Sequence, residues 1–476
     1  MKLSRPALVA TGLILVGWAL RIRVFVLGRS LSWFEAALAI NILHKPLTGL
    51  VGPLDNHESA PLGFMLLSRL SVFLFGDGER ALRLVPLLCG LVALPLVYVF
   101  AKRYLGPWLA LACVAFFALS QTAILWSSLC KTYSMDFLVA LLLMGLADQL
   151  AVPSVGTWWI AAFAGAIGIW CSLPAVFVLA GIWLAAAMRI AHARAFQRIA
   201  PLVAVGAAWT ASFAAYFAVS LRHQEADPFL KQIWADYFLS IHDLSQTRFL
   251  LAMTFSDPLD VVMGSAWPMV PLVAAGCVRL WRRVGLRLAA IVLPIAAVAT
   301  ASFAHLYPWA DRLLWFAAPL LLVLVFGGAS QLGEWAGRLL HPSAAPIVAA
   351  GLIAAMTARA TLHLLETPVV EDQIRPLVAH IGQHIQPGDR VYVGEFLAVY
   401  DYYRSRFGLD AVPAVPGPYF DTDPPADCSS IRDVMGAPRV WALTNRDDAR
   451  ACLTQFGEGA AVMRGSAASL YLYAPR

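Results

Sequence analysis

Long apolar runs recur along most of this 476-residue chain and constrain its fold more than any other feature. Runs of roughly 17 to 25 residues, enough to cross about 30 Å of hydrocarbon as helix, follow one another from residue 7 to near residue 363. Charged residues make up only 13% of the chain, and the mean hydropathy is +0.70. Soluble domains carry about 25% charged residues. The sequence therefore predicts an all-α polytopic membrane protein and excludes a soluble domain.

The apolar runs predict about eleven membrane spans. Residues 157–190 form one run too long for a single span, and Cys171-Ser172-Leu173-Pro174 supplies a break within it, because proline favours a turn there. The first span continues to Arg21 and Arg23 without a small-residue cleavage site, so we expect it to remain as an anchor. The expected spans lie near residues 7–27, 81–101, 107–126, 134–150, 157–172, 174–190, 200–220, 263–281, 286–304, 313–330 and 344–363.

Charge in the connections predicts the orientation, because short loops rich in Lys and Arg stay cytoplasmic. Every second connection is basic: Lys2 and Arg5, Lys102 and Arg103, Arg189, Arg194 and Arg198, then Arg279, Arg282, Arg283 and Arg287. The alternate connections carry acids: Glu35, Asp55, Glu58, Asp136, Glu225, Asp227, Asp236, Asp243, Asp257 and Asp311. The N-terminus is thus expected inside and the C-terminal segment outside. The net charge of +6 needs no nucleic-acid partner.

Two large outer regions are expected. The first, residues 28–80, holds short apolar stretches near 36–50 and 60–75, the latter containing Arg69, and these suit helices lying in the membrane interface. The second, residues 364–476, is charged and Pro-rich. We expect there a small α/β domain with a helix at 371–386 and strands at 390–393, 439–443 and 469–473. The membrane domain would then comprise residues 1–363.

Cysteine positions and known motifs add little chemistry. Five of the seven cysteines lie in or beside spans, as small apolar fillers do, whereas Cys428 and Cys452 share the outer domain. An oxidising compartment permits a disulfide between them, but sequence does not show their geometry, so pairing and free thiols both stay open. The chain has no metal-ligand spacing, phosphate-cradling glycine motif or nucleophile elbow. We expect neither a metal nor a cofactor.

Ionisable residues gather in the first outer loop, where Ser32 to Ala36 contains Glu35 and Leu54 to Pro61 contains Asp55, His57 and Glu58. Glu35 follows two aromatic residues at the bilayer edge, so desolvation is expected to raise its pKa toward the range of a useful base. Equally, Glu35 could be a helix-start acid, and the Asp55 to Glu58 cluster could be a solvated turn.

Two further groups of polar residues lie at outer span ends. Lys131 and Tyr133 precede the fourth span, and Asp311 and Arg312 precede the tenth. An Arg that enters a bilayer span needs a partner or a ligand. The alternatives are a snorkelling Lys with an interfacial Tyr, and a simple pairing of Asp311 with Arg312.

Four motifs in one order carry a family resemblance: Trp33 to Ala36, Asp55 to Pro61, Ser128 to Asp136 and Tyr307 to Arg312. With them the chain resembles the C-type integral-membrane glycosyltransferases, in the bacterial branch related to protein mannosyltransferases, aminoarabinose transferases and lipopolysaccharide galacturonosyltransferases. The resemblance covers nearly the whole chain and includes an outer C-terminal domain after Gln386 to Val393.

The resemblance implies a hexosyl- or pentosyltransferase that moves a sugar from a polyprenyl-phosphate donor to a lipid, glycan or protein acceptor. The reaction would take place at the periplasmic face of the bacterial cytoplasmic membrane, among membrane lipids. A carboxylate would deprotonate the acceptor hydroxyl, and basic groups would offset the charge on the departing phosphate. By resemblance, Lys131 and Arg312 would hold that phosphate, with Tyr133 and Asp311 beside them.

The sequence departs from the family pattern at two acids. Phe34 stands where the family has the Asp of an Asp-Glu pair, and Leu129 stands where it has an acid before the Lys. Three alternatives stay open: Glu35 is the base, one of Asp55, Glu58 and His57 is the base, or the chain is a noncatalytic partner of an active C-type paralogue. A lipid-linked glycan translocase is a further alternative, although charges here lie at the outer rim rather than at mid-membrane.

Overall fold

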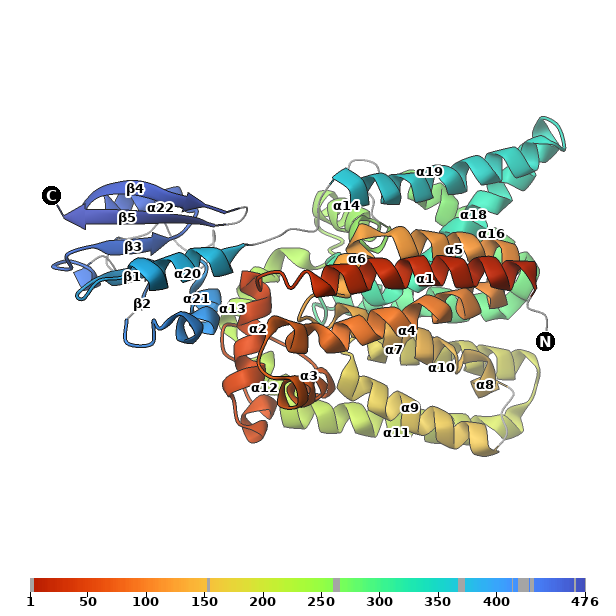
Figure 1. Ribbon diagram of the computed structural model, residues 1–476. Helices are drawn as coiled ribbons and strands as arrows, with labels where there is room; N and C mark the ends of the chain where they lie inside the picture. Colours follow the sequence, from red (N-terminus) through yellow and green to blue (C-terminus); the bar gives the residue numbers. More distant parts are fainter. Residues whose placement is uncertain are drawn as a thin grey trace.

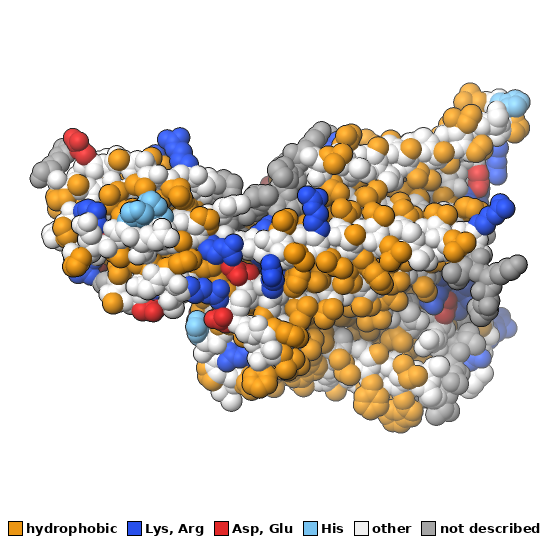
Figure 2. Space-filling model, viewed as in Figure 1, with side chains coloured by type: hydrophobic (Ala, Val, Ile, Leu, Met, Phe, Trp, Pro, Cys, Tyr) orange, Lys and Arg blue, Asp and Glu red, His pale blue; other side chains and the backbone are white. Residues whose placement is uncertain are grey.

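A computed structural model of the chain describes residues 4–151, 155–259, 266–366, 373–412, 414–417, 428, 432–465 and 468–475. It consists of a bundle of long helices and, beyond one end of the bundle, a small unit built on a β-sheet (Figure 1). Apolar side chains cover much of the visible bundle surface (Figure 2). Charged side chains gather where the sheet unit meets the bundle. This is the distribution expected when lipid surrounds the helices and water surrounds the sheet.

Within the described residues, eight helical stretches are long and apolar enough to cross a membrane. The number of crossings itself stays a prediction. The helices of the bundle are α1 (Arg5–Val26), α4 (Glu79–Leu105), α5 (Pro107–Leu119), α6 (Gln121–Trp126), α7 (Tyr133–Met144), α8 (Ala147–Ala151), α9 (Val155–Cys171), α10 (Ala175–His192), η2 (Phe196–Arg198), α11 (Ile199–Tyr216), η3 (Phe217–Leu221), α16 (Met269–Val284), η6 (Gly285–Leu288), α17 (Ala289–Phe303), η7 (Arg312–Ala317), α18 (Ala318–Leu339) and α19 (Ala344–Glu366).

The expected break in the run 157–190 is confirmed, since α9 ends at Cys171 and α10 begins at Ala175. The expected continuous helix over 107–126 is wrong, because the backbone of Ser120 leaves the helical region and separates α5 from α6. Residues 134–150 likewise divide into α7 and α8. Part of the expected span 263–281 lies outside the described residues.

A buried arginine explains the break after α5. The Arg21 side chain is fully buried, yet an unpaired cation inside a membrane is costly. Its guanidinium donates to the carbonyl oxygen of Phe117 at 2.9 Å and to the hydroxyl of Ser127 at 3.2 Å. Phe117 lies in the last turn of α5, where carbonyls lack partners within the helix. Arg21 therefore joins α1 to the broken α5–α6 pair.

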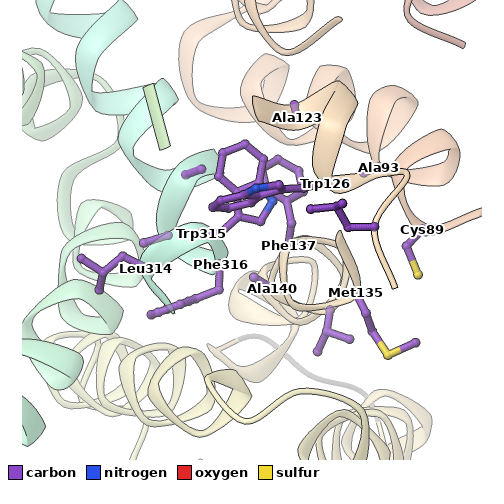
Figure 3. Packing of buried hydrophobic residues seen from close by; sticks show 14 of the residues in the cluster. Cys89, Ala93, Ala123, Trp126, Met135, Phe137, Ala140, Leu314, Trp315 and Phe316 are labelled. Atoms are coloured by element: carbon purple, nitrogen blue, oxygen red, sulfur yellow. The ribbon is translucent and has the colours of Figure 1, made fainter. Parts of the chain in front are cut away.

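An aromatic cluster packs helices of the bundle against one another (Figure 3). Trp126 of α6 and Trp315 of η7 meet edge to face at 4.6 Å, and Phe137 of α7 lies 5.5 Å from Trp315. Such contacts are worth about 0.5–1.5 kcal/mol beyond burial. The cluster fixes the start of α7 relative to η7, although 178 residues of sequence separate Phe137 from Trp315.

The first outer region forms α2 (Trp33–His44), η1 (Leu47–Val51) and α3 (Leu62–Phe75). Most of α2 is buried, whereas α3 exposes Phe73, Leu74 and Phe75. This arrangement agrees with a helix lying against lipid. Arg69 lies within α3, where it donates to the carbonyl of Ile42 and so joins α3 to α2.

A second outer connection follows η3. It carries α12 (Arg222–Gln224), α13 (Pro228–Ile233), η4 (Ala235–Tyr237), α14 (Leu244–Met253) and α15 (Ser256–Leu259). Gln224 ties this connection to the first outer region, since its Oε1 accepts from the Ser59 hydroxyl at 2.8 Å and from the Ala60 amide at 3.1 Å.

The C-terminal unit contains a five-stranded sheet in the order β2-β1-β3-β5-β4. Its central strands β1 and β3 are parallel and buried, and β5 pairs antiparallel with β3. The three expected strands and the expected helix are present, although residues 371–372 lie outside the described part of that helix; β2 and β4 were not expected. The elements are α20 (Ile374–His384), β1 (Arg390–Val393), α21 (Leu397–Arg404), η8 (Ser405–Phe407), β2 (Ala414–Pro416), β3 (Val440–Leu443), α22 (Asp447–Leu453), β4 (Gly457–Arg464) and β5 (Ser469–Pro475).

The structure pairs Cys428 with Cys452 in a disulfide. The other five cysteines are free. The bond closes a loop with a sequence separation of 24 residues, and such cross-links typically stabilise a fold by about 2–4 kcal/mol.

We expect thiol labelling of the unfolded, unreduced protein to modify five cysteines and labelling after reduction to modify all seven. Intact-mass spectrometry measures both numbers. Seven labelled thiols without reduction would contradict the pairing.

Candidate active site

Glu35 lies at the start of α2 and forms a buried ion pair with Arg83 of α4. Arg83 donates through Nε and Nη2 to the two carboxylate oxygens at 2.8 and 2.7 Å. The amide of Cys130 donates to Glu35 Oε1 at 2.8 Å, and the amide and hydroxyl of Ser32 each donate to Oε2 at 3.1 Å. Only 1% of the Glu35 side chain is exposed. The carboxylate therefore joins α2, α4 and the segment before α7.

The expected rise in the pKa of Glu35 is wrong. Burial by itself raises this pKa, but the charge and hydrogen bonds of Arg83 outweigh burial and hold it below its ordinary value. Several donors directed at one carboxylate stabilise its ionised form. Glu35 is thus a stable anion, and a base needs a readily protonated group.

Glu58 and Lys131 form a second ion pair nearby. Lys131 Nζ lies 2.6 and 2.7 Å from the two Glu58 oxygens, and the side chains are only 12% and 11% exposed. Burial raises the pKa of Glu58 above its ordinary value, although Lys131 and Arg312 lower it in part. Of the predicted bases, Glu58 has the pKa shift that favours accepting a proton.

The turn before Glu58 has an unusual backbone. Asn56 and His57 both adopt left-handed conformations, with φ of 59° and 55°. Few residues other than glycine adopt this region, and Asn and His adopt it more often than most of them. His57 Nδ1 lies 2.8 Å from Asp227 Oδ2, and its ring lies 4.2 Å from that of Phe229. These contacts join the two outer connections and hold the turn that presents Glu58.

Phe34 supplies an aromatic contact to the site, whereas Tyr133 packs in the aromatic cluster. Lys131 Nζ lies 5.9 Å from the centre of the Phe34 ring, within the range of a cation–π contact. Tyr133 lies 4.6 Å from Trp126 in the aromatic cluster. Phe34 therefore contacts the same ammonium group that Glu58 neutralises.

Arg312 approaches this pair from η7. Its charge is close enough to lower the pKa of Glu58 in part, and its guanidinium lies 5.1 Å from the Trp234 ring. The alternative that Asp311 pairs with the Arg312 side chain does not describe the structure. Asp311 accepts from the backbone amide of Arg312 at 2.7 Å and so caps η7.

Asp55 lies apart from the other candidates. Its carboxylate pairs with Lys45 at 2.9 Å, and 62% of its side chain is exposed. Asp136, expected in an outer connection, lies inside α7, buried, and accepts from the Thr132 hydroxyl at 2.8 Å.

The structure thus brings together Glu58, Lys131 and Arg312, with Phe34 and His57 adjoining them. Sequence reasoning missed two residues that position this group, Arg83 and Asp227. Arg83 carried a signal, because an arginine within an apolar span requires a partner. Asp227 carried none, since its pairing with His57 depends on the tertiary fold. Within the described residues, no group of three or more His, Cys, Asp or Glu side chains could hold a metal ion.

Known proteins resemble this chain in part of its sequence and in its fold. Residues 59–217 match the family model of dolichyl-phosphate-mannose-protein mannosyltransferases. A search of curated proteins finds no match. Among solved structures, the chain is similar to ArnT from Cupriavidus metallidurans bound to undecaprenyl phosphate, with a TM-score of 0.57 and 16% identity over 97% of this chain and 98% of that chain. The apo form of that ArnT gives a TM-score of 0.58 with the same identity and coverage.

The chain has the C-type glycosyltransferase fold. This finding confirms the predicted fold class. With its apolar helices the chain is a multi-pass membrane protein. Within the C-type fold, the Glu58–Lys131 pair comes from the two outer connections that follow α2 and α6.

We predict that Glu35→Gln strongly lowers the stability of this protein. Removing one partner leaves Arg83 buried without a counter-charge, which typically costs about 3–5 kcal/mol. Asp55→Asn, which breaks the exposed pair with Lys45, should cost at most about 1 kcal/mol. Thermal unfolding in detergent compares the two variants. Equal melting temperatures would contradict a structural role for Glu35.

Proposed function

We propose that this protein transfers a sugar from a polyprenyl-phosphate donor to a hydroxyl of a lipid, glycan or protein, at the periplasmic face of the cytoplasmic membrane. The observation that carries the proposal is the largely buried Glu58–Lys131 pair with the Arg312 charge beside it, within a C-type fold. A carboxylate with a raised pKa next to two cations suits removal of a proton beside a phosphate leaving group.

Glu58 is the proposed base. Its raised pKa favours proton uptake, whereas Glu35 is held as an anion by Arg83. Asp55 is exposed and paired with Lys45. His57, held by Asp227, would keep the Glu58 turn in place. We therefore assign Glu35 and His57 to positioning the loop, although both were candidates for the base.

Lys131 and Arg312 are the proposed phosphate ligands. A phosphate that reaches Lys131 competes with Glu58 for the ammonium group, because charge-assisted hydrogen bonds form equally well to either anion. Donor binding would thus release the Glu58 carboxylate. Tyr133 would line the site and Asp311 would orient Arg312 by capping η7. The solved ArnT structure with undecaprenyl phosphate supports a carrier of this class.

The reaction then balances in one displacement. The acceptor oxygen forms a bond to the anomeric carbon while its proton passes to Glu58. The bond from the anomeric carbon to the phosphate oxygen breaks, and the electron pair leaves with polyprenyl phosphate, which Lys131 and Arg312 stabilise. The products are the glycosylated acceptor with inverted configuration, the carrier phosphate and protonated Glu58. The reaction needs no nucleotide cofactor.

We predict that Glu58→Gln abolishes transfer and that Glu58→Asp keeps part of it. The ionised form of Glu58 is the active one, so the rate should fall as the pH drops through a pKa above the ordinary 4.5. A strain lacking the gene should lose one sugar from its extracted envelope glycolipids or glycans, as mass spectrometry measures.

The control for this experiment is Asp55→Asn, which should restore the sugar as wild type does. Restoration by Glu58→Gln as well would reject Glu58 as the base. If every variant that replaces an acidic residue restored the sugar, a noncatalytic partner of an active C-type paralogue would be favoured. Unchanged glycans with altered transport of lipid-linked glycans across the membrane would favour a translocase.

We predict that Arg312→Ala weakens binding of undecaprenyl phosphate by about tenfold or more, because a charged hydrogen bond contributes about 1.5–3 kcal/mol. Arg248→Ala is the matched control, since Arg248 lies over Trp267 at 4.9 Å as Arg312 lies over Trp234. Binding to purified protein in nanodiscs measures both. An equal loss of undecaprenyl-phosphate binding in the two variants would contradict the assignment of Arg312 as a phosphate ligand.

A further inference from the structure

The C-terminal unit meets the bundle at Glu79, the first residue of α4. Glu79 Oε1 accepts from Arg375 Nη1 and from the Tyr403 hydroxyl, each at 2.9 Å, and Arg406 lies 3.9 Å from Oε2. The side chain of Glu79 is only 12% exposed. α2 and α21 also pack against each other. Figure 2 shows the charged side chains gathered at this junction.

The linker between α1 and α2, residues 28–31, is held by the same contacts. Arg375 Nη2 donates to the carbonyl of Gly28 at 3.2 Å, and the amide of Arg375 donates to the Ser30 hydroxyl at 3.2 Å. The amide of Leu31 donates to the Tyr403 hydroxyl at 2.9 Å. Arg375 and Tyr403 therefore each contact both Glu79 and the linker.

Arg83 holds the linker from the other side. It donates to the carbonyls of Arg29 and Ser30 at 2.7 and 2.9 Å while pairing with Glu35. Gly28 has a φ of +58°, so the chain turns sharply there in a conformation that favours glycine. The linker thus lies between the bundle and the C-terminal unit, with polar partners from both.

We propose that the C-terminal unit acts as a clamp that sets the position of the first outer loop, with Tyr403 and Arg375 as positioning residues. The linker leads directly to Phe34, whose ring contacts Lys131. A shift of the linker would move Phe34 and the Glu35–Arg83 pair, and hence the neighbourhood of the phosphate ligand Lys131. The effect of the clamp on donor binding rests on the proposed function, whereas the contacts that form the clamp do not.

A second set of contacts docks the two units without touching the linker. The Tyr402 hydroxyl donates to the carbonyl of Asp77 at 2.9 Å, and Arg406 donates to the same carbonyl at 2.7 Å. Tyr402 and Tyr403 are adjacent on α21 and both buried. Loss of the Tyr402 hydroxyl therefore removes a docking contact alone, whereas loss of the Tyr403 hydroxyl removes a contact to Glu79 and the contact to the linker.

The experiment compares Tyr403→Phe with the matched control Tyr402→Phe in the full chain, reconstituted in nanodiscs. Tyr403→Phe leaves the buried Leu31 amide without its acceptor, whereas Tyr402→Phe removes only a docking contact. Hydrogen exchange of residues 28–36 should become about tenfold faster in Tyr403→Phe, the equivalent of one lost hydrogen bond, and change little in Tyr402→Phe. Binding of undecaprenyl phosphate should weaken several-fold in Tyr403→Phe alone.

Equal exchange in the two variants would overturn the clamp. Faster exchange with unchanged binding of undecaprenyl phosphate would overturn the positioning role. If wild type itself fails to bind undecaprenyl phosphate, the proposed donor is rejected, and the exchange comparison still decides whether the clamp exists.

Discussion

The buried ion pair between Glu35 and Arg83 is the interaction on which the outer half of this protein depends. A charge inside a low-dielectric interior is stable only when partners satisfy it completely. Glu35 meets that condition with donors from Arg83, Ser32 and Cys130, and Arg83 meets it with the carbonyls of Arg29 and Ser30. The Glu35–Arg83 pair therefore joins the first loop, α4 and the segment that carries Lys131.

This constraint separates structure from chemistry in the first outer loop. Both carboxylate oxygens of Glu35 accept hydrogen bonds and its pKa is lowered, so it suits a structural role as a permanent anion. Glu58 is hydrogen-bonded to Lys131 and its pKa is raised, so it can accept a proton if Lys131 moves away. The absence of an acid at position 34 fits the same arrangement, because Phe34 packs beside Lys131 while Glu58 provides the carboxylate. Two acids that look equivalent in the sequence thus have different environments.

Much of the fold could be predicted because membrane helices depend on local composition. Apolar runs and the Pro174 break were sufficient for the helices around α9 and α10, and the short apolar runs at 391–393 and 440–443 were sufficient for β1 and β3. The division of residues 107–126 into α5 and α6 could not be predicted, because it depends on Arg21 reaching Phe117 from another helix. Strands β2 and β4 are short or exposed at the sheet edges and lacked a buried pattern.

The sequence could predict which residues belong to the candidate site, but not what each residue does there. Glu58 was identified from the ionisable cluster of the first loop, and Lys131 and Arg312 from charge at the outer span ends. Their convergence depends on the tertiary fold, including the packing of Trp126 against Trp315. The low pKa of Glu35 depends on Arg83, which lies 48 residues away and was counted as part of a span.

The most direct measurement is a structure of the full chain with bound undecaprenyl phosphate, determined by electron cryo-microscopy in nanodiscs. Our account predicts the phosphate within hydrogen-bond distance of Lys131 and Arg312, with Lys131 drawn away from Glu58. A phosphate bound elsewhere, with the Glu58–Lys131 pair intact, would contradict it.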